Sequence, residues 1–376
     1  MERGFLGISD LILHGGKVPP HLMKRMKGLS EAIVKFIVDE YGPTELIQRL
    51  SDPFWFQAFN NVIGMDWDSS GSTSVVMGIL KELTWREDLG FVVLGGKGKN
   101  MLKVREEAEE AARKFDIDPM EVSLFSKVTA RIDSALLQDG YDLYVHYVAL
   151  SEDAWLTVQQ GMDLERKLAR RYHVTNRNFP WKNPHSGISG LRGEALDVSA
   201  PTGKKVMEVG VEVINEGKAF SLLKVARASL KGQRRLDGSF VIDPSKLKYY
   251  YPVRPTKQLE LALEKIAQAS PSSAEELLLS PGLGPRVVRA LALIAHVIYG
   301  YEPSFDDPVT FDPFAYAYAV GGKDGIPYPY DLNVADEAIG LLREALEESS
   351  IEVKLKKAAL KRLSEWIGRT LGEVQR

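Results

Sequence analysis

The sequence predicts an α/β (mixed) N-terminal domain followed by an all-α C-terminal domain. Apolar residues recur at helical spacing near the N-terminus, two alternating runs occupy 141–162, and residues 258–300 and 333–372 keep a helical period without strand-like runs. Because 376 residues exceed what one hydrophobic core usually supports, we expect several domains. The predicted boundaries are 1–165 for the α/β domain, 166–257 for a basic region of strands and loops, and 258–376 for the helical domain.

The composition restricts both chemistry and location. No run of about 18 apolar residues occurs, and the N-terminus lacks the basic start and small-residue cleavage site of a signal peptide. We therefore expect a cytoplasmic protein without a membrane partner. The absence of cysteine excludes disulfides, thiolate-bound zinc, iron–sulfur clusters and a cysteine nucleophile. Any metal ion must be held by carboxylates or by the six histidines.

Local patterns predict the elements of the N-terminal domain. Apolar side chains at helical spacing run from Leu22 to Tyr41, and Gly42-Pro43 ends that helix. Further along, we expect a helix at 72–84, a strand at 91–96 and a solvated helix at 103–115.

Two alternating runs at 141–150 and 154–162 flank the polar turn 151–153, which predicts an antiparallel hairpin. Side chains of a strand alternate between its two faces. We expect one face of the first strand to carry Tyr141, Leu143, Val145 and Tyr147, and the other Asp142, Tyr144 and His146.

The charge is unevenly distributed. Residues 164–257 hold 19 lysines and arginines against 8 aspartates and glutamates, although the whole chain carries a net charge of −3. Such a basic region is either a footprint for a polyanion or a solvated surface. Within it, Arg170-Arg171-Tyr172-His173 mixes cations with an aromatic ring, as single-strand binding surfaces do, and a helix end with surface arginines explains it equally well.

Residues 271–293 predict two helices joined by a tight turn. Ser273 and Glu276 form a capping box, and Pro281-Gly282 ends the first helix. Leu283 lies between two glycines and can fill the space between the helices. Pro285 suits the first turn of the second helix, whose unpaired backbone N–H groups and dipole favour an anion.

This segment resembles the helix-hairpin-helix motif, in which an apolar residue and Pro-Gly-apolar-Gly precede an apolar helix. The resemblance implies that the turn grips a DNA phosphate backbone without reading sequence. An ordinary helical hairpin is the alternative. The residues that would contact DNA are Gly282, Leu283, Gly284, Arg286, Val287 and Arg289, together with Arg170 and Arg171 of the basic region.

The hairpin also resembles that of base-excision glycosylases, where a catalytic aspartate follows about twenty residues later. Asp306 and Asp307 lie near that spacing. Two features depart from the family pattern: Arg286 occupies the position of the lysine found in bifunctional members, and the usual apolar-Asp-Thr-His context is missing. Lys323 is either a displaced amine nucleophile or an exposed turn lysine.

A wider resemblance covers nearly the whole chain. An uncharacterised archaeal and bacterial family, known only as a domain of unknown function, is similar in its segments LHGGKVPPHL, SDPFWFQAF, DWDSSGST, LGGKGK, IDSALLQDGYDLY, TVQQGMD, ARRYH, PGLGPRVVRALAL and GGKDGIPYP. The resemblance implies that the hairpin and the N-terminal domain occur together, and it assigns no catalytic residue.

Two polar groups of the N-terminal domain suggest chemistry. Asp68, Ser70 and Ser72 have a spacing that can offer a carboxylate and two hydroxyls to a cation, although an aspartate N-cap explains it equally well. For hydrolysis of a phosphodiester around Mg²⁺ or Mn²⁺, the hairpin and the loop before it could supply Asp139, Asp142, His146 and Gln160, and the segment 95–99 could supply Lys97 or Lys99. Gln160-Gly161-Met162 does not match the usual nuclease signature of an acid two residues before a lysine, and a structural hairpin is the alternative.

No nucleotide cofactor is expected, because the three Gly-Gly-Lys triplets at 15–17, 95–97 and 321–323 lack the spacing of a phosphate-binding loop that ends in Gly-Lys-Ser/Thr. The sequence thus favours a DNA-binding protein that acts on the backbone of double-stranded or branched DNA, as a metal-dependent repair nuclease. The alternatives are a glycosylase that uses Asp306 or Asp307 and a non-catalytic DNA-binding scaffold.

Overall fold

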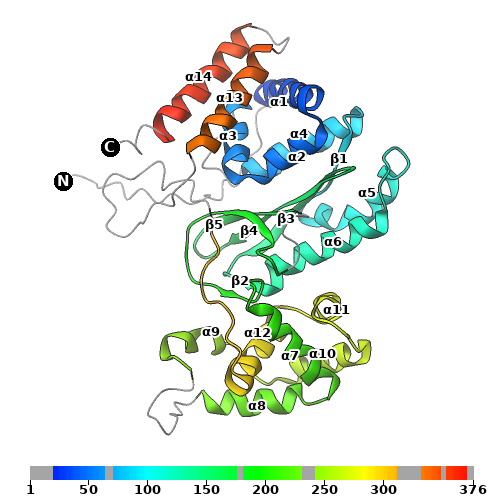
Figure 1. Cartoon of the computed structure of the whole chain (residues 1–376), viewed down its shortest axis with the longest axis vertical. Coiled ribbons are helices and arrows are strands. Elements are labelled where there is room, and N and C mark those ends of the chain that lie inside the picture. Colours follow the sequence, from blue (N-terminus) through cyan, green and yellow to red (C-terminus); the bar gives the residue numbers. More distant parts are fainter. Residues whose placement is uncertain are drawn as a thin grey trace, which may run out of the picture.

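A computed structural model describes residues 20–63, 71–175, 181–230, 242–310, 332–348 and 353–370. It is a mixed structure of helices and an antiparallel sheet, in agreement with the predicted mixed α/β character. Figure 1 shows three parts: a group of helices around both ends of the described chain, a central sheet with two helices against it, and a second group of helices at the other end. In the described part of the chain, no helix has the length and apolar character needed to cross a membrane.

The first group of helices, which we call the helical layer, joins segments from both ends of the chain. Leu29, Ile33 and Ile37 recur along one face of α1 and are fully buried, as their spacing predicted. Gly42, with φ +85°, ends α1, and Pro43 begins α2. The layer contains α1 (Pro20–Tyr41), α2 (Pro43–Ser51), α3 (Pro53–Ile63), α4 (Gly71–Arg86), α13 (Leu332–Glu348) and α14 (Val353–Thr370).

The predicted domain 258–376 is divided in the structure. Leu342 and Leu363, on α13 and α14, are buried in the core that α1 and α3 share with the sheet. Arg362 donates to the carbonyl oxygen of Val62 at 2.7 Å. The grouping of 333–372 with 258–300 was therefore wrong. A helical period specifies an amphipathic helix but not the surface that its apolar face covers.

The central sheet is antiparallel with strand order β1-β3-β4-β5-β6. The predicted hairpin is present, because β3 and β4 pair from Leu150–Trp155 outward. The expected alternation holds only from Val145 onward, since the register shifts between Leu143 and Val145 and reverses the faces on either side of the shift. The strands are β1 (Phe91–Lys97), β3 (Asp142–Ser151), β4 (Trp155–Asp163), β5 (Leu168–Thr175) and β6 (His185–Ser189).

Each face of the sheet is covered. Val93, Val145 and Val158 face the helical layer, whereas Val92 and Val148 face α5 (Val104–Ala111) and α6 (Pro119–Arg131). Phe125 of α6 stacks on Trp155 with ring centroids 4.2 Å apart. A sheet buried on both sides has no solvated face for polar residues, so each of its polar side chains needs an internal partner.

The second group of helices, which we call the lower helical group, includes part of the predicted basic region. The run at 206–214, which resembles a strand, is helical, because Val206, Val209 and Val213 fall on one buried helical face. Two short strands, β2 (Leu137–Gln138) and β7 (Leu196–Asp197), join the group to the sheet. Its helices are α7 (Gly203–Asn215), α8 (Ala219–Ser229), α9 (Leu247–Tyr250), α10 (Lys257–Ala269), α11 (Ala274–Leu279) and α12 (Pro285–Ile294).

Candidate functional site

The turn between α11 and α12 is built by local signals. Ser273 caps α11, since its Oγ accepts from the Glu276 N–H at 3.1 Å, while the Glu276 carboxylate accepts from the Ser272 N–H at 2.7 Å. Gly282 has φ +98°, a conformation that favours glycine. The Leu283 side chain is buried in the core of the lower helical group. Two helices are therefore joined by a short turn, and Leu283 of this turn is buried.

Two backbone donors at the start of α12 lack an acceptor among the described residues. Gly284 is the extended N-cap residue, and it provides no side-chain cap. Pro285 has no N–H, and the first helical bond runs from the Val288 N–H to the Gly284 carbonyl at 3.0 Å. The N–H groups of Arg286 and Val287 bond to no atom of the described residues. These groups carry the positive end of the helix dipole.

The same turn borders an open hollow of about 590 Å³. Arg254, Arg286 and Arg289 line it, and none of them forms an ion pair with a described acidic residue. Burial lowers the pKa of Arg289, whose Nε has no hydrogen-bond partner. Val287 lines the hollow as well. Because its side chain is buried, it presents its backbone N–H to a ligand in the hollow. We call this surface the arginine hollow; its cations and free amides suit an anion.

Arg170 and Arg171 are not part of any surface. Both lie on β5, whose residues are all buried, and their exposed fractions are 1% and 0%. The prediction that they contact DNA is therefore wrong. Successive residues of a strand face opposite sides, so the two guanidinium groups have different surroundings.

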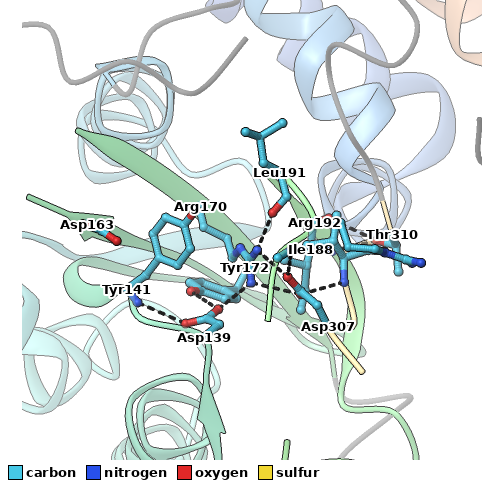
Figure 2. A network of polar contacts seen from close by, with 12 residues as sticks. Asp139, Tyr141, Asp163, Arg170, Tyr172, Ile188, Leu191, Arg192, Asp307 and Thr310 are labelled. Carbon is cyan, nitrogen blue, oxygen red and sulfur yellow. Dashed lines mark hydrogen bonds and ion pairs between the residues drawn. The ribbon is translucent and has the colours of Figure 1, made fainter. Parts of the chain in front are cut away.

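Arg170 lies at the centre of an ion network (Figure 2). Its Nη1 and Nη2 bind both oxygens of Asp307, at 3.0 and 2.8 Å, and Nη1 also binds Asp139 at 2.8 Å. Tyr172 donates its hydroxyl to Asp139 at 2.8 Å, and the Arg170 guanidinium lies 4.6 Å from the centre of the Tyr141 ring. Burial alone lowers the pKa of Arg170, but the two carboxylates raise it above its ordinary value.

Arg171, on the other face, has neutral partners among the described residues. Its Nε donates to His173 Nε2 at 3.0 Å, and its Nη2 donates to Gln57 at 3.3 Å. The guanidinium lies 4.4 Å from the centre of the Phe56 ring. Burial lowers the pKa of Arg171 to about 9, because no acidic group among the described residues offsets the loss of water.

A second polar network crosses the sheet toward α6. Gln159 Nε2 donates to the Thr129 carbonyl at 3.1 Å and to Asp133, so its Oε1 accepts from His146 Nδ1 at 2.8 Å. His146 Nε2 then accepts the Ser126 hydroxyl at 2.8 Å. Asp133 in turn forms a hydrogen bond with His185 Nε2 at 2.5 Å, which extends the network to His185. Burial lowers the pKa of His146 to about 4, so this imidazole is neutral at pH 7.

His146 is expected to make the protein less stable as the pH falls from 7 to 5. In the unfolded chain the pKa of His146 is near 6.5. As the pH falls, the unfolded state therefore binds a proton that the folded state does not bind until about pH 4. That difference costs about 2 kcal/mol of unfolding free energy at pH 5. His146→Gln should be less stable than wild type at pH 7. The difference in unfolding free energy between the two proteins should shrink by about 2 kcal/mol between pH 7 and 5, as measured by denaturant titrations.

His21→Gln, which changes an exposed histidine on α1, is the control for this experiment. The change in its difference from wild type between the two pH values is the reference for the change seen in His146→Gln. A difference for His146→Gln that stays constant between pH 7 and 5 would show that His146 does not titrate as a buried neutral group.

The structure does not assemble the predicted nuclease site. Asp139 is engaged by Arg170, and His146 and Gln160 lie on opposite faces of the sheet. Asp142 is exposed at the start of β3, and the Lys97 amine lies 5.5 Å from the centre of the Tyr144 ring. Among the described residues, no group of three or more histidines, aspartates or glutamates is placed to hold a metal ion.

The remaining predicted residues are placed as follows. Asp307 is bound by Arg170 and by the Gly193 N–H at 2.6 Å, so its carboxylate has a structural role, whereas Asp306 is exposed. Ser72 is fully buried, and its hydroxyl has no hydrogen-bond partner. Asp68, Ser70 and Lys323 lie outside the described residues.

Sequence reasoning missed Arg254 and His185. Arg254 precedes a proline in a loop and carries no motif, so only its position beside the turn identifies it. His185, in the segment Asn183-Pro184-His185, gave no sign of its partner Asp133, which lies 52 residues earlier.

Comparison with known proteins identifies a family. A family model described as "Protein of unknown function (DUF763)" matches residues 7–330, so the chain belongs to this family. The searches against curated proteins and against solved structures gave no match.

Proposed function

We propose that this member of the DUF763 family is a DNA-binding protein that holds double-stranded or branched DNA by its phosphate backbone through a helix-hairpin-helix formed by α11 and α12. One observation carries the proposal: the Arg286 and Val287 N–H groups have no acceptor among the described residues, and they border a hollow lined by three arginines that form no ion pair with a described residue. Backbone amides at a helix N-terminus bind phosphate, and arginine adds charge and fixed geometry. Because these donors do not meet base edges, the binding is sequence-independent.

Gly284→Asp is the sharpest test of this proposal. Gly284 has φ −149° and ψ 179°, which any residue adopts, and a Cβ there meets no atom within 4 Å. Aspartate at an N-cap accepts from the N–H groups of the next residues, so it should cap α12 and occupy the phosphate position with its own carboxylate. We expect Gly284→Asp to keep or raise the unfolding free energy and to lower DNA affinity at least about 10-fold.

Gly284→Ala is the matched control, because it adds a Cβ without a carboxylate and leaves the two amides free. Its DNA affinity should stay within about threefold of wild type. Equal affinities for Gly284→Asp and wild type would refute the proposal. Gly282 is not suitable for this purpose, since any side chain is strained at φ +98°.

The nuclease and glycosylase hypotheses stay predictions from the sequence. The same protein preparations can be used to test them. Nicking of a labelled branched duplex that stops when a chelator is added supports the nuclease. Base release without metal supports the glycosylase. Binding without either product supports the scaffold, which is the function that the described geometry favours.

A further inference from the structure

The guanidinium group of Arg171 is buried and has no acidic partner among the described residues. Its residue is 0% exposed, yet its hydrogen-bonding and ring partners among the described residues are a histidine, a glutamine and a phenylalanine, none of which carries a negative charge. His173 cannot supply the missing charge. Its Nδ1 bonds to the Leu50 carbonyl at 3.0 Å and its Nε2 accepts from Arg171, which leaves the ring neutral. Proteins rarely bury an arginine charge without an anion beside it.

The free part of this arginine can be identified. The Arg171 Nε and Nη2 atoms each donate a hydrogen bond, whereas Nη1 is buried and has no hydrogen-bond partner. Next to it in the sheet, Ser189 of β6 is paired with Arg171, so both side chains leave the same face. Ser189 is fully buried, and its hydroxyl also lacks a partner.

The helix above this face provides a third unsatisfied group. Phe56 and Gln57 of α3 contact Arg171, and Asn60 follows Phe56 by one turn, on the same side of the helix. The Asn60 Nδ2 donates to the Phe56 carbonyl at 2.6 Å, which fixes the amide, and its buried Oδ1 has no partner. A cationic donor, a hydroxyl and an acceptor are thus left unsatisfied between α3 and the sheet.

We propose that Arg171, Ser189 and Asn60 form an internal binding site for the phosphate group of a small ligand, enclosed between α3 and strands β5 and β6. Phosphate fits this set better than a carboxylate, because inorganic phosphate, or a phosphate monoester in its monoanionic form, offers both ionised oxygens for Arg171 and a hydroxyl for the Asn60 Oδ1. The site is separate from the arginine hollow and does not depend on DNA binding. A ligand enters when α3 opens locally from the sheet, so the test includes refolding with the ligand present.

The test measures the melting temperature after refolding in inorganic phosphate or in chloride at equal ionic strength. All proteins carry Gly284→Asp, so that the hairpin is capped. At a hundred times its Kd, phosphate should raise the melting temperature by about 3 °C. In Arg171→Met this shift should vanish, and the melting temperature in chloride should be equal or higher, by up to about 5 °C, because an uncompensated charge has been removed.

Gln57→Glu provides an independent second variant. The new carboxylate lies beside the Arg171 Nη2 and takes the place of the ligand's charge. We expect a melting temperature about 1–5 °C higher in chloride and no further response to phosphate. If Arg171 were paired with a carboxylate of its own chain, both variants would instead lower the melting temperature, and the proposal would fail. It would also fail if Arg171→Met kept the phosphate shift, or if acetate stabilised the unaltered site as much as phosphate does.

Discussion

Replacing Arg254 and Arg286 together by glutamine is expected to weaken binding to duplex DNA roughly 10- to 100-fold at moderate salt. Both arginines are exposed, line the arginine hollow and form no ion pair with a described residue, so their removal should leave the fold unchanged. Each arginine that neutralises a phosphate releases about one counterion. The slope of log affinity against log salt should therefore become shallower by about two, equally for all DNA sequences.

A matched control removes the same charge elsewhere. Arg113 and Lys114 are exposed at the end of α5 and also lack ion pairs in the described structure, so Arg113→Gln with Lys114→Gln changes the net charge identically. This control should keep both the affinity and the salt slope. If the two double variants lose affinity to the same extent, DNA responds to total charge, and the arginine hollow has no special role.

Arg170→Met is expected to lower the unfolding free energy by about 3–5 kcal/mol. The substitution preserves much of the side-chain volume but leaves the carboxylates of Asp139 and Asp307 buried without their shared cation. Removing one partner of a buried ion network costs far more than the network contributes in total, because the remaining charges cannot reach water. Chemical denaturation followed by tryptophan fluorescence measures the loss.

Arg171→Met is the matched comparison, because this adjacent residue is equally buried but has no acidic partner among the described residues. We expect Arg170→Met to lower the unfolding free energy and Arg171→Met to leave it unchanged or raise it. Arg170→Lys should recover only part of the loss, since an ammonium group cannot bind both Asp307 oxygens and Asp139 with the geometry of the guanidinium fork. A loss below about 1 kcal/mol in Arg170→Met would mean that the carboxylates become protonated or reach water.

The sequence predicts those parts of the molecule that short-range signals determine. The turn after α11 follows from Ser273, Gly282 and Pro285, which act within a few residues of one another. The hairpin of β3 and β4 follows from alternation and a polar turn. Neither prediction required knowledge of the rest of the chain.

The strand β5 shows why other parts could not be predicted. Its sequence LARRYHVT has the charges of a surface segment, yet all eight residues are buried. The two carboxylates that make this possible for Arg170 lie 31 and 137 residues away in the chain. No local pattern encodes such a pairing, so a buried ion network looks like an exposed basic patch until the partners are placed.

The packing of α13 and α14 against α1 and α3 has a consequence for biosynthesis. Tyr41 donates to Glu344 at 3.4 Å across 303 residues, and Leu363 completes the same core as Leu29. During synthesis, α1 and α3 therefore lack their final neighbours until α13 and α14 have left the ribosome. During that interval the early helices expose apolar surface. The described core that contains α7–α12 reaches no further along the chain than Phe305, so it is complete earlier. Nascent chains should therefore acquire protease resistance in α7–α12 before they acquire it in α1–α3.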